Sequence, residues 1–264
     1  MPIVTISRGS YNRGRAVAEK LAQKIGYTCI SRDEVIENLD EFHLQEIKLV
    51  RGLNDAFSVL DRFPNGKKRF VSAIRAALLQ RFMAGNVVYH GLVGHHFVKT
   101  ISHVLKVRII ADTESRVADE MNREDISAEK ARFILKSDDE ERRKWCMFLY
   151  GIDLFDAEIY NLVIRVGHLS EDDAVDIITN AVKLPSFQET AQSRAELADS
   201  ALSSIVTYAL FDFPSASVSA RDGHVKVVLK VPEDQCSVIK ERIEAKLSAI
   251  DAVKEQSIII DPYY

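Results

Sequence analysis

Ile3-Val4-Thr5-Ile6-Ser7-Arg8-Gly9-Ser10-Tyr11-Asn12-Arg13-Gly14-Arg15 is the stretch of sequence that decides the fold. Its first four residues are all β-branched, which favours a strand. After Gly14, apolar side chains recur at helical spacing, at Val17, Leu21 and Ala22. The stretch therefore predicts a strand, then a turn bounded by Gly9 and Gly14, then a helix that begins near Gly14.

Strand and helix patterns alternate along the chain that follows. Further strands are predicted at 27–30, 87–90, 105–110 and 162–166, with helices such as 67–83 between them. Strands that alternate with helices form a mostly parallel sheet with helices on both faces. Ser170-Glu171-Asp172-Asp173 predicts a capped start for a helix at about 171–182.

The pattern changes after residue 184. Residues 185–194 lose helical periodicity and contain a proline and several small polar residues, which is typical of a linker. Asp222-Gly223 then predicts a tight hairpin turn. We expect an α/β unit at 1–184 and a small α+β unit at 195–264. Its predicted elements, in the order α-β-β-α-β, are 196–210, 216–220, 224–231, 233–250 and 256–260.

Composition narrows the class of protein. The chain has 264 residues, of which 47% are hydrophobic and 28% charged, as is ordinary for a globular protein. Its net charge of −4 argues against nonspecific nucleic-acid binding. Three cysteines without a CxxC pair indicate neither a disulfide framework nor a zinc site. No stretch reads as a signal peptide or a transmembrane segment, so we expect a cytoplasmic protein.

The turn between Gly9 and Gly14 has the spacing of a phosphate-binding loop. Such a turn aims backbone N–H groups at an anion, beside a helix N-terminus whose dipole favours negative charge. Arg15 stands where a Walker motif has lysine, and Ala16 where it has the Ser or Thr that binds Mg²⁺. Read as a plain Walker motif, the stretch departs at two positions, and an ordinary strand-to-helix turn is the alternative.

Longer stretches carry a family resemblance. Ile6-Ser7-Arg8 followed by Gly14-Arg15-Ala16-Val17-Ala18-Glu19-Lys20-Leu21-Ala22 resembles the cytidylate-kinase-like family of nucleoside-monophosphate kinases, and the resemblance continues through 26–34, 104–111, 116–131, 138–143 and 160–178. It implies a P-loop kinase-like fold, ATP and Mg²⁺ as cofactors, and arginine as the expected residue at position 15. The cofactor-binding residues that it implies are Gly9, Ser10, Tyr11, Asn12, Arg13, Gly14, Arg15, Ala16 and Arg116.

Arginines are concentrated between residues 112 and 150. Arg116 and Arg123 lie seven residues apart and would share one face of a helix. Phosphoryl transfer spreads negative charge that guanidinium groups stabilise under a lid, and 137–143 resembles the family's Asp-x-x-Arg lid pattern. Arg15, Arg123 and Arg142 are therefore the catalytic candidates. The alternative is that these arginines, with Arg132 and Arg143, form solvated pairs with the acidic residues interleaved among them.

The end of the predicted strand at 87–90 should lie in the ligand crevice of the sheet. By the resemblance, Arg32, Asp33, His90 and Gly91 are the candidates for binding the acceptor substrate. Related kinases more often have Gly-Arg-Gly in this loop, whereas this chain has Leu92 in place of the arginine. A metal site on His90, His95 and His96 is an alternative to a packed or phosphate-facing loop, but without acidic partners we expect no metal ligands here.

Two sets of large apolar side chains could serve as stacking platforms, but core or lid packing is the expected role of both. They are Phe42, Leu44, Ile47, Leu49 and Val50, in the segment that should cover the acceptor, and Trp145, Phe148 and Leu149. No spacing positions a nucleophile for Ser-His-Asp or Cys-His catalysis.

Residues 195–264 resemble a BON domain in their pattern of elements. Val225, Val227 and Leu229 alternate with Lys226 and Lys230, so the apolar set should be buried and the lysines exposed. Asp222, His224 and Asp261 are expected at turns or on the surface rather than in a site. Modules of this type bind, so a second copy of the chain, another protein or a lipid surface stays open as its contact.

Three functions remain in view. The first is a kinase that moves the γ-phosphoryl group of ATP to a nucleoside monophosphate, which the arginines favour. The second is a catalytically weak or silent nucleotide sensor read out by the C-terminal unit, which Ala16 and Leu92 favour. A purely structural scaffold is the third.

Overall fold

The computed structural model describes residues 2–37, 65–91 and 93–263. Its larger part is built on a five-stranded sheet in which every neighbouring pair is parallel, in the order β2-β3-β1-β4-β5. The strands are β1 Ile3–Arg8, β2 Thr28–Ser31, β3 Val87–His90, β4 Val104–Ala111 and β5 Leu162–Val166. The predicted fold class is confirmed, with each strand within two residues of its expected bounds.

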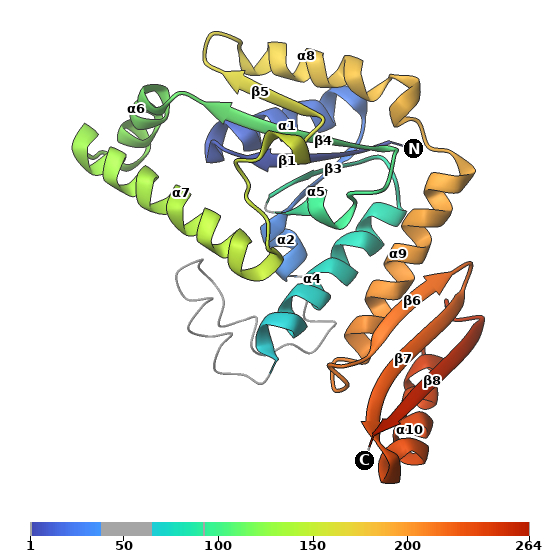
Figure 1. Ribbon diagram of the computed structural model, residues 1–264. Helices are drawn as coiled ribbons and strands as arrows, with labels where there is room; N and C mark the ends of the chain where they lie inside the picture. Colours follow the sequence, from blue (N-terminus) through green and yellow to red (C-terminus); the bar gives the residue numbers. More distant parts are fainter. Residues whose placement is uncertain (1, 38–64, 92, 264) are drawn as a thin grey trace.

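Helices cover both faces of this sheet (Figure 1). They are α1 Tyr11–Ile25, α2 Arg32–Glu37, α4 Gly66–Met83, α5 Gly94–Phe97, α6 Thr113–Glu124, α7 Ala128–Tyr150 and α8 Glu171–Val182. Alternate residues of one strand enter opposite cores, since Val88 packs on the side of α1 and α8, whereas Val87 and Tyr89 pack on the side of α4. Burial on both faces explains why the strands read as continuous apolar runs.

The smaller C-terminal unit is α9 Ala191–Ala209, β6 Ser217–Arg221, β7 His224–Pro232, α10 Cys236–Ser248 and β8 Glu255–Tyr263. Its mixed sheet has the order β6-β7-β8, in which β6 pairs antiparallel and β8 parallel to β7. Asp222 and Gly223 both have positive φ, at 52° and 87°, as the predicted tight turn requires. Val225, Val227 and Leu229 are buried, which confirms the predicted apolar face of β7.

Helix α9 begins at Ala191, five residues before the predicted start. Thr190 and Ser193 form a capping box at the start of α9. The last small polar residues of the predicted linker therefore begin a helix. Leu197 and Ala201 lie in the same core as α4, whereas Leu202 and Val206 lie in the core of the C-terminal unit. The helix thus belongs to both parts of the molecule.

Helix α1 begins at Tyr11, not near Gly14 as expected. The turn before it is therefore only Gly9 and Ser10, and Gly14 lies inside the first helical turns. Residues 11–13 include neither proline nor glycine, the residues that most disfavour a helix, and Arg13 pairs with Asp119 of α6, which holds the first turn in place. The longer glycine-bounded loop predicted from the sequence was wrong.

The other local expectations are met at helix α8 and at the cysteines. Ser170 and Asp173 form a capping box at the start of α8. Cys29, Cys146 and Cys236 are all free thiols. Among the residues that the structure describes, no helix has the length and apolar character needed to span a bilayer.

Candidate functional site

A cavity of about 200 Å³ lies between the N-terminus of α1 and the helices α6 and α7. We call it the α6–α7 cavity. It is lined by Ser10, Asn12, Arg116, Asp119, Glu120, Arg123, Leu135, Asp138 and Arg142. Because α1 and α6 follow the carboxyl ends of β1 and β4, the cavity stands at the edge of the sheet where parallel α/β folds bind their ligands.

Three arginines of two helices meet in this cavity. Arg116 and Arg123 come from one face of α6, as their spacing predicted, and Arg142 comes from α7. Arg116 donates to both carboxylate oxygens of Asp139, at 2.6 and 2.9 Å, and Arg123 donates to Glu120 at 2.6 Å. Burial lowers the pKa of Arg142, so its positive charge is poorly solvated. The carboxylates of Asp139 and Asp138 act against that shift.

The other two arginines of this region do not line the cavity. Arg132 pairs with Glu114 at 2.6 Å and Arg143 with Asp153 at 2.5 Å, and both guanidinium groups are largely exposed. These are the solvated ion pairs that the alternative interpretation of the arginine-rich region foresaw. The region thus divides into arginines that face the cavity and arginines that tie its outer surface together.

The turn before α1 is held by strand β4. The N–H groups of Gly9 and Ser10 both donate to the carbonyl oxygen of Ile109, at 2.8 and 3.3 Å. A Cβ on Gly9 would lie 2.8 Å from Cγ2 of Ile110, so only glycine fits this approach. These two N–H groups are committed within the protein, which leaves the orphan N–H groups of the first turn of α1, at residues 11–13, as the backbone donors for an anion.

The predicted phosphate-binding side chains differ in where they lie. Ser10 and Asn12 line the cavity. Arg13 donates to Asp119 at 2.7 and 3.2 Å, and this hydrogen bond raises the pKa of Arg13. Arg15 is exposed, donates to Glu19 at 2.7 Å, and does not line the cavity. Gly14 is buried against Arg8, and Ala16 offers no hydroxyl.

The four predicted acceptor-site residues form a separate group at the ends of β2 and β3. The guanidinium carbon of Arg32 lies 5.0 Å from the ring centre of Trp145. Nη1 of Arg32 lies 4.0 Å from Oδ1 of Asp33. Gly91 donates to the Ile6 carbonyl oxygen and lies against Arg32. Burial first, and Arg8 second, lower the pKa of His90 to about 4, so this imidazole is neutral at pH 7.

Two predictions about this neighbourhood fall on undescribed residues, and two are tested. The acceptor-covering segment 42–50 and Leu92 lie outside the described residues. Trp145 is 1% exposed and packs edge-on against Phe70, so its expected role in packing is confirmed. Among the described histidines, cysteines and acidic residues, no group of three or more is arranged to hold a metal ion.

A buried polar network beneath the turn was missed by the sequence analysis. Arg108 of β4 is 7% exposed and donates to the Tyr160 hydroxyl at 3.2 Å, and that hydroxyl lies 3.1 Å from Oγ of Ser7. The signal was a charged residue next to the apolar run at the end of a strand, because an unpaired buried charge is costly and demands partners. The network joins β1, β4 and the segment before β5 under the candidate site.

The α6–α7 cavity fits a triphosphate better than it fits a tightly held metal ion. Its three guanidinium groups and the N-terminus of α1 suit phosphate oxygens. Mg²⁺ is commonly held by one or two carboxylates together with substrate phosphates and water. Asp138 is the lining carboxylate for which the described chain shows no ion pair, since Asp119 pairs with Arg13 and Glu120 with Arg123.

Comparisons with known proteins agree with this architecture. The model of the cytidylate kinase-like family matches residues 3–168. A cytidylate kinase of Archaeoglobus fulgidus is 28% identical over 188 residues, which are 70% of this chain and 97% of that protein. A cytidylate kinase of Thermococcus kodakarensis is 33% identical over 97 residues, 37% of this chain and 49% of that protein.

The solved structures extend the likeness to the fold. An uncharacterised protein from Eubacterium ventriosum has a TM-score of 0.53 and 17% identity, and the match covers 69% of this chain and 97% of that one. At this identity the likeness concerns the fold alone.

Proposed function

Because this chain belongs to the cytidylate kinase-like family, we propose that it is a nucleoside-monophosphate kinase that moves the γ-phosphoryl group of ATP to a nucleoside monophosphate. The observation that carries the proposal is the convergence of Arg116, Arg123 and Arg142 on the cavity at the N-terminus of α1. Guanidinium groups there would stabilise the charge that develops on the transferring phosphoryl group.

In this proposal the donor and the acceptor approach from two sides of the turn before α1. The triphosphate would lie in the α6–α7 cavity, against the first turn of α1, with Mg²⁺ bound through Asp138 and the phosphates. The acceptor would lie beside Arg32, Asp33, His90 and Gly91, at the ends of the neighbouring strands β2 and β3. Arg123 and Arg142 are the proposed catalytic residues, because both line the cavity and neither belongs to the acceptor group.

A second function is favoured by the turn itself. The N–H groups of Gly9 and Ser10 are bonded to Ile109, and Arg15 pairs with Glu19 one turn along α1. A turn that offers few donors to the β and γ phosphates suits a weak or silent nucleotide sensor whose state is read out by the C-terminal unit. For phosphoryl transfer, Arg15 would have to leave Glu19 and turn toward the cavity.

A coupled phosphotransfer assay separates these two functions. ATP and GTP serve as donors and CMP, dCMP, UMP and AMP as acceptors, with native protein and the variants Arg15→Ala and Arg142→Ala. Turnover that Arg142→Ala abolishes supports the kinase. Nucleotide-dependent thermal stabilisation without turnover for any pair supports the sensor, and absence of both effects at millimolar nucleotide rejects both functions.

We also propose that the C-terminal unit, 195–264, is a BON-like binding module joined through 185–194 to a kinase domain at 1–184. Its element order, α9-β6-β7-α10-β8, supports this assignment. Leu197 and Ala201 pack with α4, so a deletion that begins at 195 would strip side chains from the larger core. A deletion of 215–264 is the better test. Loss of self-association, or of binding to a protein or to lipid vesicles, with folded nucleotide-binding protein left behind, would identify the module's role.

A further inference from the structure

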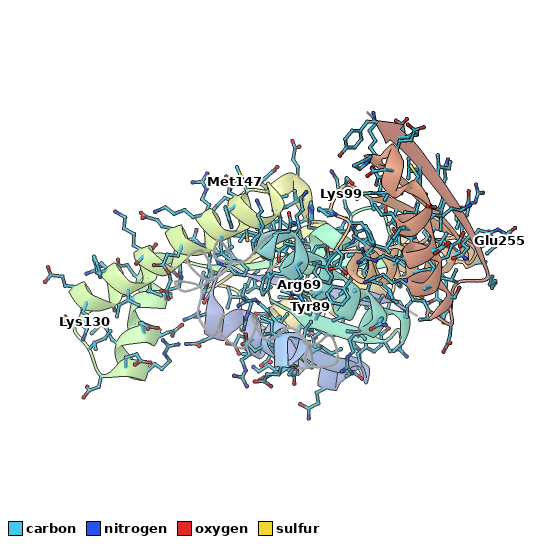
Figure 2. All side chains as sticks on the ribbon, turned by 90° about the horizontal axis from the view of Figure 1, so that it is seen from below. Arg69, Tyr89, Lys99, Lys130, Met147 and Glu255 are labelled. Carbon is cyan, nitrogen blue, oxygen red and sulfur yellow. The ribbon has the colours of Figure 1, made fainter. Side chains whose placement is uncertain are left out.

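A second cavity, of about 380 Å³, lies apart from the α6–α7 cavity. We call it the α4–α9 cavity. Residues of α4, α5, the end of α7 and α9 line it together with the segment after α5: Val71, Arg75, His96, Phe97, Lys99, Thr100, Leu149, Tyr150 and Ser200. None of them lines the α6–α7 cavity. Figure 2 shows Lys99 between the end of α7 and the C-terminal unit.

The nitrogen-bearing side chains that line the α4–α9 cavity are all basic. Arg75, His96 and Lys99 line it, and among the residues that the structure describes no aspartate or glutamate does. In the described part of the chain, the Arg75 and Lys99 side chains make no hydrogen bond or ion pair. The chain as a whole has more acidic than basic residues, 39 against 35, so composition does not account for this local excess of positive charge.

The pKa of His96 responds to this excess of positive charge. Burial is the first cause that lowers the pKa of His96, and the positive charges of Arg75 and Lys99 are the next two. These positive groups repel one another, and no carboxylate of the described residues lies between them. A bound anion would therefore stabilise them. The adjoining cavity, which shares Val71 and Leu149 with this one, has Lys67, Lys68 and Arg69 as its charged residues in the described ranges and no acidic one there.

The remaining lining has two characters. Thr100, Ser200 and Tyr150 bring hydroxyl groups that can donate to oxyanions. Phe97, Leu149 and Val71 form an apolar wall, with the Phe97 and Tyr150 rings edge to face at 5.6 Å. Cationic and hydroxyl groups together with apolar side chains suit a ligand that carries its charge at one end, and small-molecule sites begin at about 300 Å³.

We propose that the α4–α9 cavity is a second ligand site, which binds a phosphate-bearing small molecule of about the size of a nucleotide. Arg75, Lys99 and the hydroxyl groups bind the phosphate, and the apolar wall contacts the body of the ligand. The occupant touches α9 at Ser200, next to Ala201 in the larger core. The site does not depend on the proposed kinase activity.

Calorimetric titration of the full chain tests this site. The probes are inorganic phosphate, CMP and ATP, and the variants are Arg75→Gln, Arg142→Gln and Arg81→Gln. Arg81 is the matched control, because it is an exposed arginine of the same helix that lines neither cavity. We expect one binding event that survives Arg142→Gln and Arg81→Gln and that Arg75→Gln weakens about tenfold or more, since the lost contacts are charge-assisted hydrogen bonds.

A second measurement locates the ligand whatever its affinity. The imidazole resonances of His96, assigned with His96→Gln, should move on addition of the bound probe in native protein and in Arg142→Gln. The proposal is overturned if no probe binds native protein at millimolar concentration, if Arg142→Gln rather than Arg75→Gln abolishes the event, or if Arg75→Gln and Arg81→Gln weaken it equally. A binding event that only Arg142→Gln removes would still agree with the proposed kinase site.

Discussion

The two cavities differ in how their positive charges are balanced. In the α6–α7 cavity, Arg116 pairs with Asp139 of α7 and Arg123 with Glu120 of α6, so the charges are held in place before any ligand arrives. In the α4–α9 cavity, Arg75 and Lys99 have no such partners in the described chain, and burial first, then these two charges, lower the pKa of His96. The first arrangement favours fixed geometry, as catalysis requires, and the second favours attraction of an anion.

The largest effect that tests this difference is catalytic. We expect Arg142→Ala to lower kcat of phosphoryl transfer by about 10²–10³-fold, because it removes one fixed positive group from the transition state. Arg132→Ala is the control, since Arg132 pairs with Glu114 and does not line the cavity. Steady-state kinetics measures both variants, and an equal loss of kcat in the two would remove the distinction between cavity and surface arginines.

A second test addresses the turn that supports the α6–α7 cavity. Gly9→Ala would place a Cβ 2.8 Å from Cγ2 of Ile110 and 2.9 Å from the Ile109 carbonyl oxygen. We expect it to lower the free energy of unfolding by about 1–3 kcal/mol, as overpacking does, and to weaken nucleotide binding. Urea denaturation and nucleotide titration measure the two effects.

Gly26→Ala is the matched control for Gly9→Ala. Gly26 has φ of 71° with open space around it, so an added Cβ costs only about 1 kcal/mol of left-handed strain. Nucleotide binding should be unchanged in this variant. Unchanged binding in Gly9→Ala as well would show that the close approach of the turn to β4 is not needed by the site.

The unliganded stabilities of two further variants should change in opposite directions. Arg116→Gln loses a two-pronged, largely buried contact with Asp139, and we expect the free energy of unfolding to fall by about 1–2 kcal/mol. Arg75→Gln relieves repulsion in the α4–α9 cavity and should raise it by at most about 0.5 kcal/mol. Thermal melts at low salt measure both. A clear loss in Arg75→Gln would mean that its charge is already compensated.

The smallest expected effect is on the titration of His96. Arg75→Gln should raise the pKa of His96 toward its ordinary value, whereas Arg81→Gln should leave it unchanged, and NMR titration of the imidazole measures both. Because the folded-state pKa lies below the unfolded value of about 6.5, the unfolded chain takes up the proton first, and stability is lost as the pH falls below that value. Arg75→Gln should make that loss smaller. An unchanged pKa would show that burial alone depresses it.

The sheet was predictable from the sequence because its strands are short runs rich in β-branched and apolar residues, and the central strands β1 and β3 are buried almost throughout. The start of α1 was not, because Gly14 reads equally well as the end of a turn and as a residue packed closely inside a helix. What decides between these is the hydrogen bonding of Gly9 and Ser10 to Ile109, a contact between strands about 100 residues apart that no local pattern contains.

The candidate site was predictable in its arginines and less so in their roles. Helical spacing correctly placed Arg116 and Arg123 on one face. It did not separate Arg142, which lines the cavity, from the adjacent Arg143, which pairs with Asp153 at the far side of a loop. Arg108 escaped notice because a buried charge is explained only by its distant partners, Tyr160 and Ser7.

Helix α9 has a consequence for how the molecule unfolds. Its first half is buried with Leu197 against α4, and its second half with Val206 in the smaller core, so neither core can dissolve without exposing part of the other. Heating or urea should therefore unfold the two cores at linked midpoints, because loss of the smaller core uncovers Val206 while Leu197 still holds the first half of α9 against α4. Unfolding or ligand binding in either half should then change the free energy of unfolding of the other half, even where the two share no ligand.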